Sequence, residues 1–244
     1  MQVGSIGSSC ETVKFEAPNQ EESHITNVLR TYVGREWTQT EEARLRESVL
    51  KMKVAAQALK GIEQTFVEEG VPVHRIIDQI YLGSEAYLRA LLKRTSLGGY
   101  PEGFNPKKII TLNFIEFMGE RDFDALREFA GIDHIYVPIE DSPEGFECFI
   151  PTFPKIMGEF CEALLSGEGM LIQCKMGRSR SAAAAAMCIA KIAKLTFDEA
   201  NALLRSIRSE VSRPMPIFPE GYYEYTGTVP FTWCAKQYCD ANFV

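Results

Sequence analysis

The chain has 244 residues, of which 45% are hydrophobic and 24% are charged, enough to bury the core of one domain with an N-terminal extension. Its formal net charge is −7, so nucleic acid is a poor partner and any positive field must be local. Seven cysteines without a C-x-x-C pair, three histidines and no run of 18 apolar residues predict a reduced, cytoplasmic protein with no metal site and no transmembrane segment.

The N-terminal part divides into a tail and a long helix. Residues 1–23 are rich in Gly, Ser, Glu and Gln, and we expect a disordered tail there. Thr38 and Glu41 have the spacing of a capping box, which predicts that a helix begins at this point. An apolar stripe then continues to about residue 69, with members at Leu45, Val49, Met52, Ala56, Leu59, Ile62 and Phe66. We expect the stripe to pack on the rest of the protein within a helical extension over residues 24–70; the alternative is a docking helix for a partner.

Strands and helices alternate over the remainder of the chain. The pattern predicts a strand over residues 108–112, a helix over 122–129 and a strand over 134–139. A loop, a helix over 149–165, a strand over 171–174 and helices over 182–193 and 197–208 follow, the last with a capping box at Thr196 and Glu199. Residues 222–244 are aromatic-rich, with a pattern too weak to assign. This alternation predicts an α/β fold with a central, mostly parallel twisted sheet flanked by helices.

The segment around Cys174 carries the most informative pattern. A short apolar strand ends at Cys174, a Gly-Arg-Ser loop follows, and residues 182–186, all alanine, predict the first turns of a helix. The free N–H groups and the dipole of a helix N-terminus favour an anion there and stabilise a thiolate. Arg180, six positions after Cys174, can offer a planar fork to two phosphate oxygens, and Ser181 adds a hydroxyl. The alternative is a buried cysteine beside a solvated arginine.

The C-x5-R spacing followed by Ser181 resembles the cysteine-dependent phosphatases, most of all the dual-specificity branch. The resemblance covers residues 73–214, and residues 174–181, 110–113 and 207–209 are similar to the phosphatidylglycerophosphate phosphatase subgroup. Residues 74–84 resemble the opening of the dual-specificity domain, which implies two short strands over 73–84 and a helix over 85–93. It implies a catalytic phosphatase domain over residues 71–244 that needs no cofactor. By this resemblance Cys174 attacks phosphorus, Arg180 holds the phosphoryl oxygens, and Ser181 hydrogen-bonds the sulfur to ease its departure. The phosphate would also be bound by the loop residues Lys175, Met176, Gly177, Arg178 and Ser179.

Gln173 departs from the family pattern, which usually has histidine before the nucleophile. In the family that histidine helps to orient the cysteine, so a neutral amide should leave a smaller thiolate fraction at neutral pH. Lys175 and Arg178 can compensate, because nearby cations favour a thiolate and suit a highly charged substrate. The alternative is that both side chains point to solvent.

A phosphatase also needs an acid to protonate the leaving oxygen, and the loop after the strand at residues 134–139 offers three. Asp141 lies 33 positions before Cys174, close to where the dual-specificity family has its acid, and we expect it to act as acid and then as base. Glu140 and Glu144 are the competitors. Asn113 closes an earlier strand, where the family often has an asparagine that supports the phosphate loop; a turn-forming role is the alternative.

Three hypotheses follow from these residues. The first is an enzyme, an intracellular dual-specificity protein phosphatase that removes phosphate from tyrosine and from serine or threonine. The second is a lipid phosphatase of the phosphatidylglycerophosphate or phosphoinositide type that uses the same residues. The third, motivated by Gln173, is a weakly active phospho-binding pseudophosphatase. The expected partner is thus a phosphoprotein or a phospholipid.

Overall fold

The computed structural model describes residues 20–60, 73–86, 103–113, 131–209, 211 and 231–243. They contain a five-stranded sheet of order β1-β2-β5-β3-β4. Strands β1 (Val73–Ile77) and β2 (Ile80–Ser84) are antiparallel. Strand β5 (Gly169–Cys174) pairs in parallel with β2 and with β3 (Pro106–Leu112), and β3 pairs in parallel with β4 (Asp133–Val137). The predicted mostly parallel sheet is therefore confirmed.

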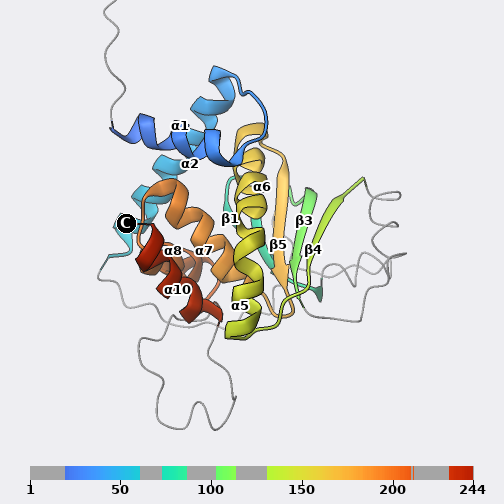
Figure 1. The fold of residues 1–244 in the computed structure, drawn as a ribbon. Helices are drawn as coiled ribbons and strands as arrows, with labels where there is room; N and C mark the ends of the chain where they lie inside the picture. Colours follow the sequence, from blue (N-terminus) through green and yellow to red (C-terminus); the bar gives the residue numbers. More distant parts are fainter. Residues whose placement is uncertain are drawn as a thin grey trace, which may run out of the picture.

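A layer of helices covers one face of this sheet (Figure 1). Helix α7 (Arg180–Ala193) packs on β5, β2 and β3, and α6 (Phe153–Ser166) packs beside it. Helices α8 (Phe197–Ile207) and α10 (Phe231–Asn242) complete the layer by packing against α7. The alanines at residues 182–186 are fully buried, and their small side chains let α7 lie close to β5. The main hydrophobic core lies between these helices and the sheet.

Two further helices, α1 (Gln20–Tyr32) and α2 (Gln39–Ala58), form the N-terminal extension. The Thr38 capping box is present, and the stripe residues Leu45, Val49, Met52 and Ala56 are buried where α2 packs on α6, α7 and α8. The packing interpretation of the stripe is therefore confirmed for these four residues. The helix ends at Ala58, earlier than predicted, and the stripe positions at residues 62 and 66 lie outside the described residues.

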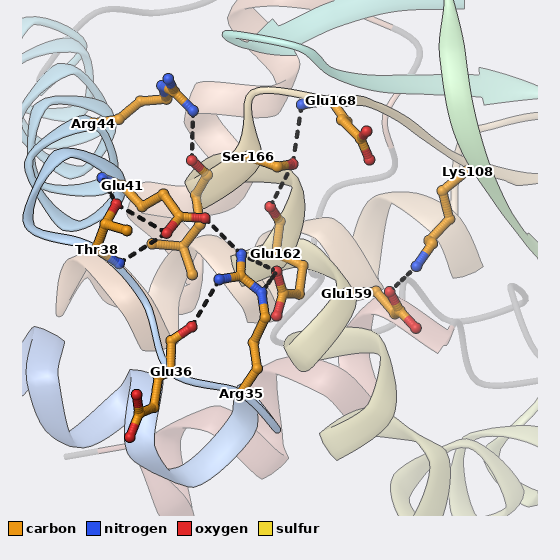
Figure 2. Close-up of polar contacts among 11 residues, drawn as sticks. Arg35, Glu36, Thr38, Glu41, Arg44, Lys108, Glu159, Glu162, Ser166 and Glu168 are labelled. Atoms are coloured by element: carbon orange, nitrogen blue, oxygen red, sulfur yellow. Dashed lines mark hydrogen bonds and ion pairs between the residues drawn. The ribbon is translucent and has the colours of Figure 1, made fainter.

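Polar contacts tie the extension to one end of α6 (Figure 2). In the loop between α1 and α2, the Arg35 guanidinium donates to Glu41 at 2.7 Å and to Glu162 on α6 at 2.8 Å. Arg44 Nη1 donates to the carbonyl oxygen of Leu165 at 2.5 Å. Such partly exposed pairs add at most about 1 kcal/mol each, so they orient the extension while the buried stripe holds it.

The structure corrects several element boundaries. Residues 143–145, predicted as loop, form the start of α5 (Pro143–Phe149), because proline suits the first helical position and the Ser142 hydroxyl accepts from the Gly145 N–H at 3.1 Å. A 3-10 turn, η1 (Ile150–Thr152), joins α5 to α6, so the helix predicted over 149–165 begins later. Helix α1 begins at Gln20, inside the expected tail. The helices predicted over 85–93 and 122–129 lie outside the described residues, except for positions 85 and 86.

None of the helices in the described ranges is both long enough and apolar enough to span a membrane.

Candidate active site

The loop between β5 and α7 lies at the carboxyl end of the parallel strands, as expected. Its start is held to β2, because the Glu85 N–H donates to the Cys174 carbonyl at 2.9 Å. Gly177 has a φ of 71°, and a Cβ there would lie 2.6 Å from the Gly83 carbonyl oxygen. Both its conformation and this close approach therefore require glycine in the loop.

The Cys174 sulfur lies inside the loop and accepts two hydrogen bonds. The Ser181 hydroxyl donates to Sγ at 3.2 Å, and the Gly177 N–H donates to it at 3.3 Å. The cysteine is 2% exposed and lies at the N-terminal end of α7, where Ser179 makes no side-chain capping hydrogen bond within the described structure. First-turn amides and the helix dipole are therefore available to an anion bound above the sulfur.

Arg180 is anchored on one side and open on the other. Its Nη1 donates to Asn113 Oδ1 and to the Ile139 carbonyl, both at 2.9 Å. The amide of Asn113 donates in turn to Glu85 Oε2 at 2.8 Å. No acceptor among the described residues hydrogen-bonds Arg180 Nε, although the residue is only 7% exposed. A buried guanidinium N–H without a partner marks a place where a ligand oxygen can bind.

Of the three candidate acids, Asp141 is the one for which the described structure gives contacts with the Cys174 loop. Ser179 Oγ donates to Asp141 Oδ1 at 2.7 Å, and Asp141 Oδ2 lies 3.9 Å from Arg180 Nε. Its side chain is 41% exposed, so it faces the open side of the loop. Glu140 and Glu144 are also exposed.

Gln173 does not contact the sulfur. Successive strand residues point to opposite faces of a sheet, so Gln173 and Cys174 project in opposite directions. The amide is fully buried, and Gln173 Nε2 donates to Thr111 Oγ1 at 2.9 Å on the adjacent strand. Any influence of Gln173 on the thiol is therefore exerted through the backbone.

The other loop residues form the rim. Lys175 and Met176 are exposed, and Arg178 is half-buried. Solvent exposure of Lys175 agrees with the alternative interpretation of that side chain, and it leaves the ammonium able to meet a charged substrate.

Arg208 is a site residue that our sequence analysis did not assign. It is 3% exposed, and its guanidinium lies beneath the loop. Its Nε donates to the Gly177 carbonyl at 3.2 Å, Nη2 donates to the Met176 carbonyl at 3.0 Å, and Nη1 lies 2.9 Å from His74 Nδ1. Because the Met176 and Gly177 carbonyl groups point toward Arg208, the N–H groups of the loop face its inside. The available signal was an arginine at the end of the helix predicted over residues 197–208, within a segment already similar to a phosphatase subgroup.

No protein family model matches the chain, and no curated protein matches it. Among solved structures, the chain is similar to human DUSP28 at 20% sequence identity and a TM-score of 0.47, over 73% of this chain and 98% of that chain. It is similar to PTPMT1 in complex with PI(5)P at 19% identity and a TM-score of 0.44, over 70% and 96% of the two chains. It is also similar to human tyrosine phosphatase-like serine/threonine/tyrosine-interacting protein at 15% identity and a TM-score of 0.46, over 70% and 98%.

Proposed function

We propose that the chain is a cysteine-dependent phosphatase that hydrolyses phosphate monoesters through a phosphocysteine intermediate. One observation carries the proposal: a buried thiol that accepts hydrogen bonds from Ser181 and Gly177 lies beside a buried arginine whose Nε has no hydrogen-bond partner among the described residues. A nucleophile and a cation thus lie at one helix N-terminus, and Arg180 Nε can donate a hydrogen bond to an oxygen of a phosphoryl group.

In the first step, the Cys174 thiolate attacks phosphorus, an S–P bond forms and the ester P–O bond breaks. Arg180 and the loop amides bind the equatorial oxygens, on which charge is spread in the transition state. Asp141 gives its proton to the leaving alkoxide or phenoxide. Its contact with Ser179 supports this role, because that contact holds the carboxyl group over the loop.

In the second step, water attacks phosphorus, the P–S bond breaks and inorganic phosphate leaves. Asp141, now a carboxylate, takes a proton from the water. Ser181 donates to the departing sulfur, and its distance of 3.2 Å from Sγ supports this assignment. The thiolate is regenerated, so no cofactor is consumed.

The decisive test is turnover of p-nitrophenyl phosphate by Cys174→Ser. We expect the rate to fall at least 1,000-fold, because an alcohol is far less ionised than a thiol at neutral pH. Cys148→Ser is the matched control, since Cys148 is exposed on α5 and should leave the rate unchanged. Equal rates for wild type and Cys174→Ser would exclude the enzymatic proposal.

For the substrate, we place phosphotyrosine and phosphoserine or phosphothreonine in proteins first, because the acid loop over residues 140–144 is similar to that of protein phosphatases. A lipid phosphate is the second candidate. It is favoured by the rim, where exposed Lys175 lies next to Met176, which is 51% exposed; a cation beside an apolar side chain suits a phospholipid head group and its chains. A phosphotyrosine peptide compared with phosphatidylglycerophosphate in vesicles separates the two, and a large preference for the lipid would reverse our order.

The weakly active phospho-binding protein is the third candidate. It would bind inorganic phosphate or vanadate in the loop yet show little difference in turnover between wild type and Cys174→Ser.

A further inference from the structure

A row of polar side chains crosses three strands beneath the candidate site; Gln173 and Thr111 are buried, and His134 is half-buried. Gln173 on β5 donates from Nε2 to Thr111 Oγ1 on β3 at 2.9 Å, and Thr111 Oγ1 lies 2.8 Å from His134 Nε2 on β4. Gln173 and Thr111 are directly paired across the two strands. Strand alternation sets all three side chains on the face opposite Cys174.

The hydrogen bonds of the row can all run in one direction, from Gln173 through Thr111 to His134. Burial lowers the pKa of His134 to about 4, so its ring is neutral at pH 7. Since Thr111 Oγ1 accepts from Gln173, its own hydrogen can be donated to the His134 Nε2 lone pair. Gln173 Oε1 has no hydrogen-bond partner among the described residues, so Thr111 is the contact that orients this amide.

The position of the row links it to the three strand ends that form the site. Gln173 immediately precedes Cys174, Thr111 lies two residues before Asn113, and the strand of His134 leads to Ile139. Asn113 Oδ1 and the Ile139 carbonyl are the two acceptors of Arg180 Nη1. Slippage of β5 against β3 would therefore move the sulfur relative to the guanidinium.

We propose that Gln173, Thr111 and His134 are positioning residues that fix the end of β5 against β3 and β4, and so keep Cys174 in register with Arg180. This inference rests on the proposed phosphatase function.

The test compares Thr111→Val, which removes the hydroxyl at nearly constant volume, with Thr111→Ser, which keeps it. Two quantities are measured on each: kcat/KM for p-nitrophenyl phosphate, and the pH dependence of iodoacetamide alkylation at Cys174, followed by mass spectrometry of its peptide. For Thr111→Val we expect about a ten-fold fall in kcat/KM, the equivalent of one lost buried hydrogen bond. The alkylation midpoint should also move to higher pH, because the sulfur is held less well against its donors. Thr111→Ser should retain wild-type values.

His134→Phe provides a second break in the row at a half-buried position, in case Thr111→Val does not fold. It should lower kcat/KM and raise the pH of the alkylation midpoint, each to a smaller extent than Thr111→Val. The variant that combines Thr111→Val with His134→Phe should lose no more kcat/KM than Thr111→Val alone. Wild-type values for both Thr111→Val and His134→Phe would overturn the proposal. So would equal losses in Thr111→Val and Thr111→Ser without a change in the alkylation midpoint, because that result would report packing alone. If wild type and Cys174→Ser turn over equally, the proposed function fails, whereas the alkylation profiles still test the row.

Discussion

Arg208 offers a sharp test of how the loop between β5 and α7 is held, because this residue lies outside the C-x5-R motif and yet contacts the loop. In Arg208→Lys the charge is kept, but one ammonium replaces a planar group that contacts the Met176 carbonyl, the Gly177 carbonyl and His74 Nδ1 at 2.9–3.2 Å. Lysine at this buried position can satisfy one of these acceptors. Two contacts are therefore lost, at about 1.5 kcal/mol each for a charged donor, which predicts about 3 kcal/mol.

We expect this loss to appear in both stability and turnover. If all of this interaction energy is lost from the transition state, kcat/KM for p-nitrophenyl phosphate should fall about 100-fold, since about 1.4 kcal/mol corresponds to a ten-fold change in rate. The free energy of unfolding in urea should fall by up to about 3 kcal/mol. Vanadate affinity should weaken in parallel, because the loop N–H groups are no longer directed inward.

The matched control is Arg44→Lys, which removes a guanidinium contact with the Leu165 carbonyl at the opposite end of β5. It should lower stability slightly and leave kcat/KM within about two-fold of wild type. The reasoning fails if Arg208→Lys keeps kcat/KM within about three-fold of wild type, or if both variants reduce it equally.

Three further predictions concern Asp141, Ser181 and His134. Asp141→Asn should lose about 100-fold on alkyl phosphates and far less on p-nitrophenyl phosphate, because a good leaving group needs no proton; equal losses, or a like effect from Glu140→Gln, would remove Asp141 from its role. Ser181→Ala should slow breakdown of the phosphocysteine more than its formation, so stopped-flow records should show a burst of nitrophenol that wild type lacks. Burial lowers the pKa of His134 from 6.5 to about 4, so unfolding takes up a proton in this range and stability is lost as pH falls from 6.5 through 4. Between pH 7 and pH 4.5, the free energy of unfolding in urea should fall by about 2 kcal/mol less in His134→Phe than in wild type, after allowance for the exposed part of the ring. An equal fall in the two proteins would contradict this prediction.

Signals contained within a few residues predicted the structure well. Both capping boxes, at Thr38 and at Thr196, are present, because the side chain and the backbone groups that it satisfies lie on one turn. The strand that ends at Cys174 and the helix that follows it are likewise read from a local change of pattern.

Pro143 shows where such local signals mislead. Proline and glycine at residues 143 and 145 indicated a loop, yet proline also suits the first turn of a helix, and α5 begins there. Burial decides between the two: Phe146 and Phe149 pack on Phe231 of α10, at ring-centroid distances of 5.1 and 5.3 Å. That contact spans more than 80 residues, and α10 itself lay in a segment whose pattern was too weak to assign.

The same distinction holds within the candidate site. Cys174, Arg180 and Ser181 were predicted as a group because they share one loop and one turn of α7. Arg208 lies 31 residues after Gly177, and the two helices α7 and α8 separate them in the chain, so only the packing of α8 brings Arg208 under the loop. For Gln173 the sequence identified an unusual residue, but its partner Thr111 depends on the pairing of β3 with β5.

Strand order explains why residues far apart in sequence can form one site. Strands β4, β3 and β5 are parallel neighbours, so their carboxyl ends lie at one edge of the sheet, and Asp141, Asn113 and Cys174 follow or end them in turn. Because β3 lies between the other two, Asn113 meets one side of the Arg180 guanidinium, while the chain leaving β4 supplies the second acceptor at Ile139. An order with β3 at the edge would place β4 next to β5 and would take Asn113 away from the Arg180 guanidinium. The motif therefore provides the thiol and the guanidinium, but the order of the strands sets them in reach of the Asp141 carboxyl group.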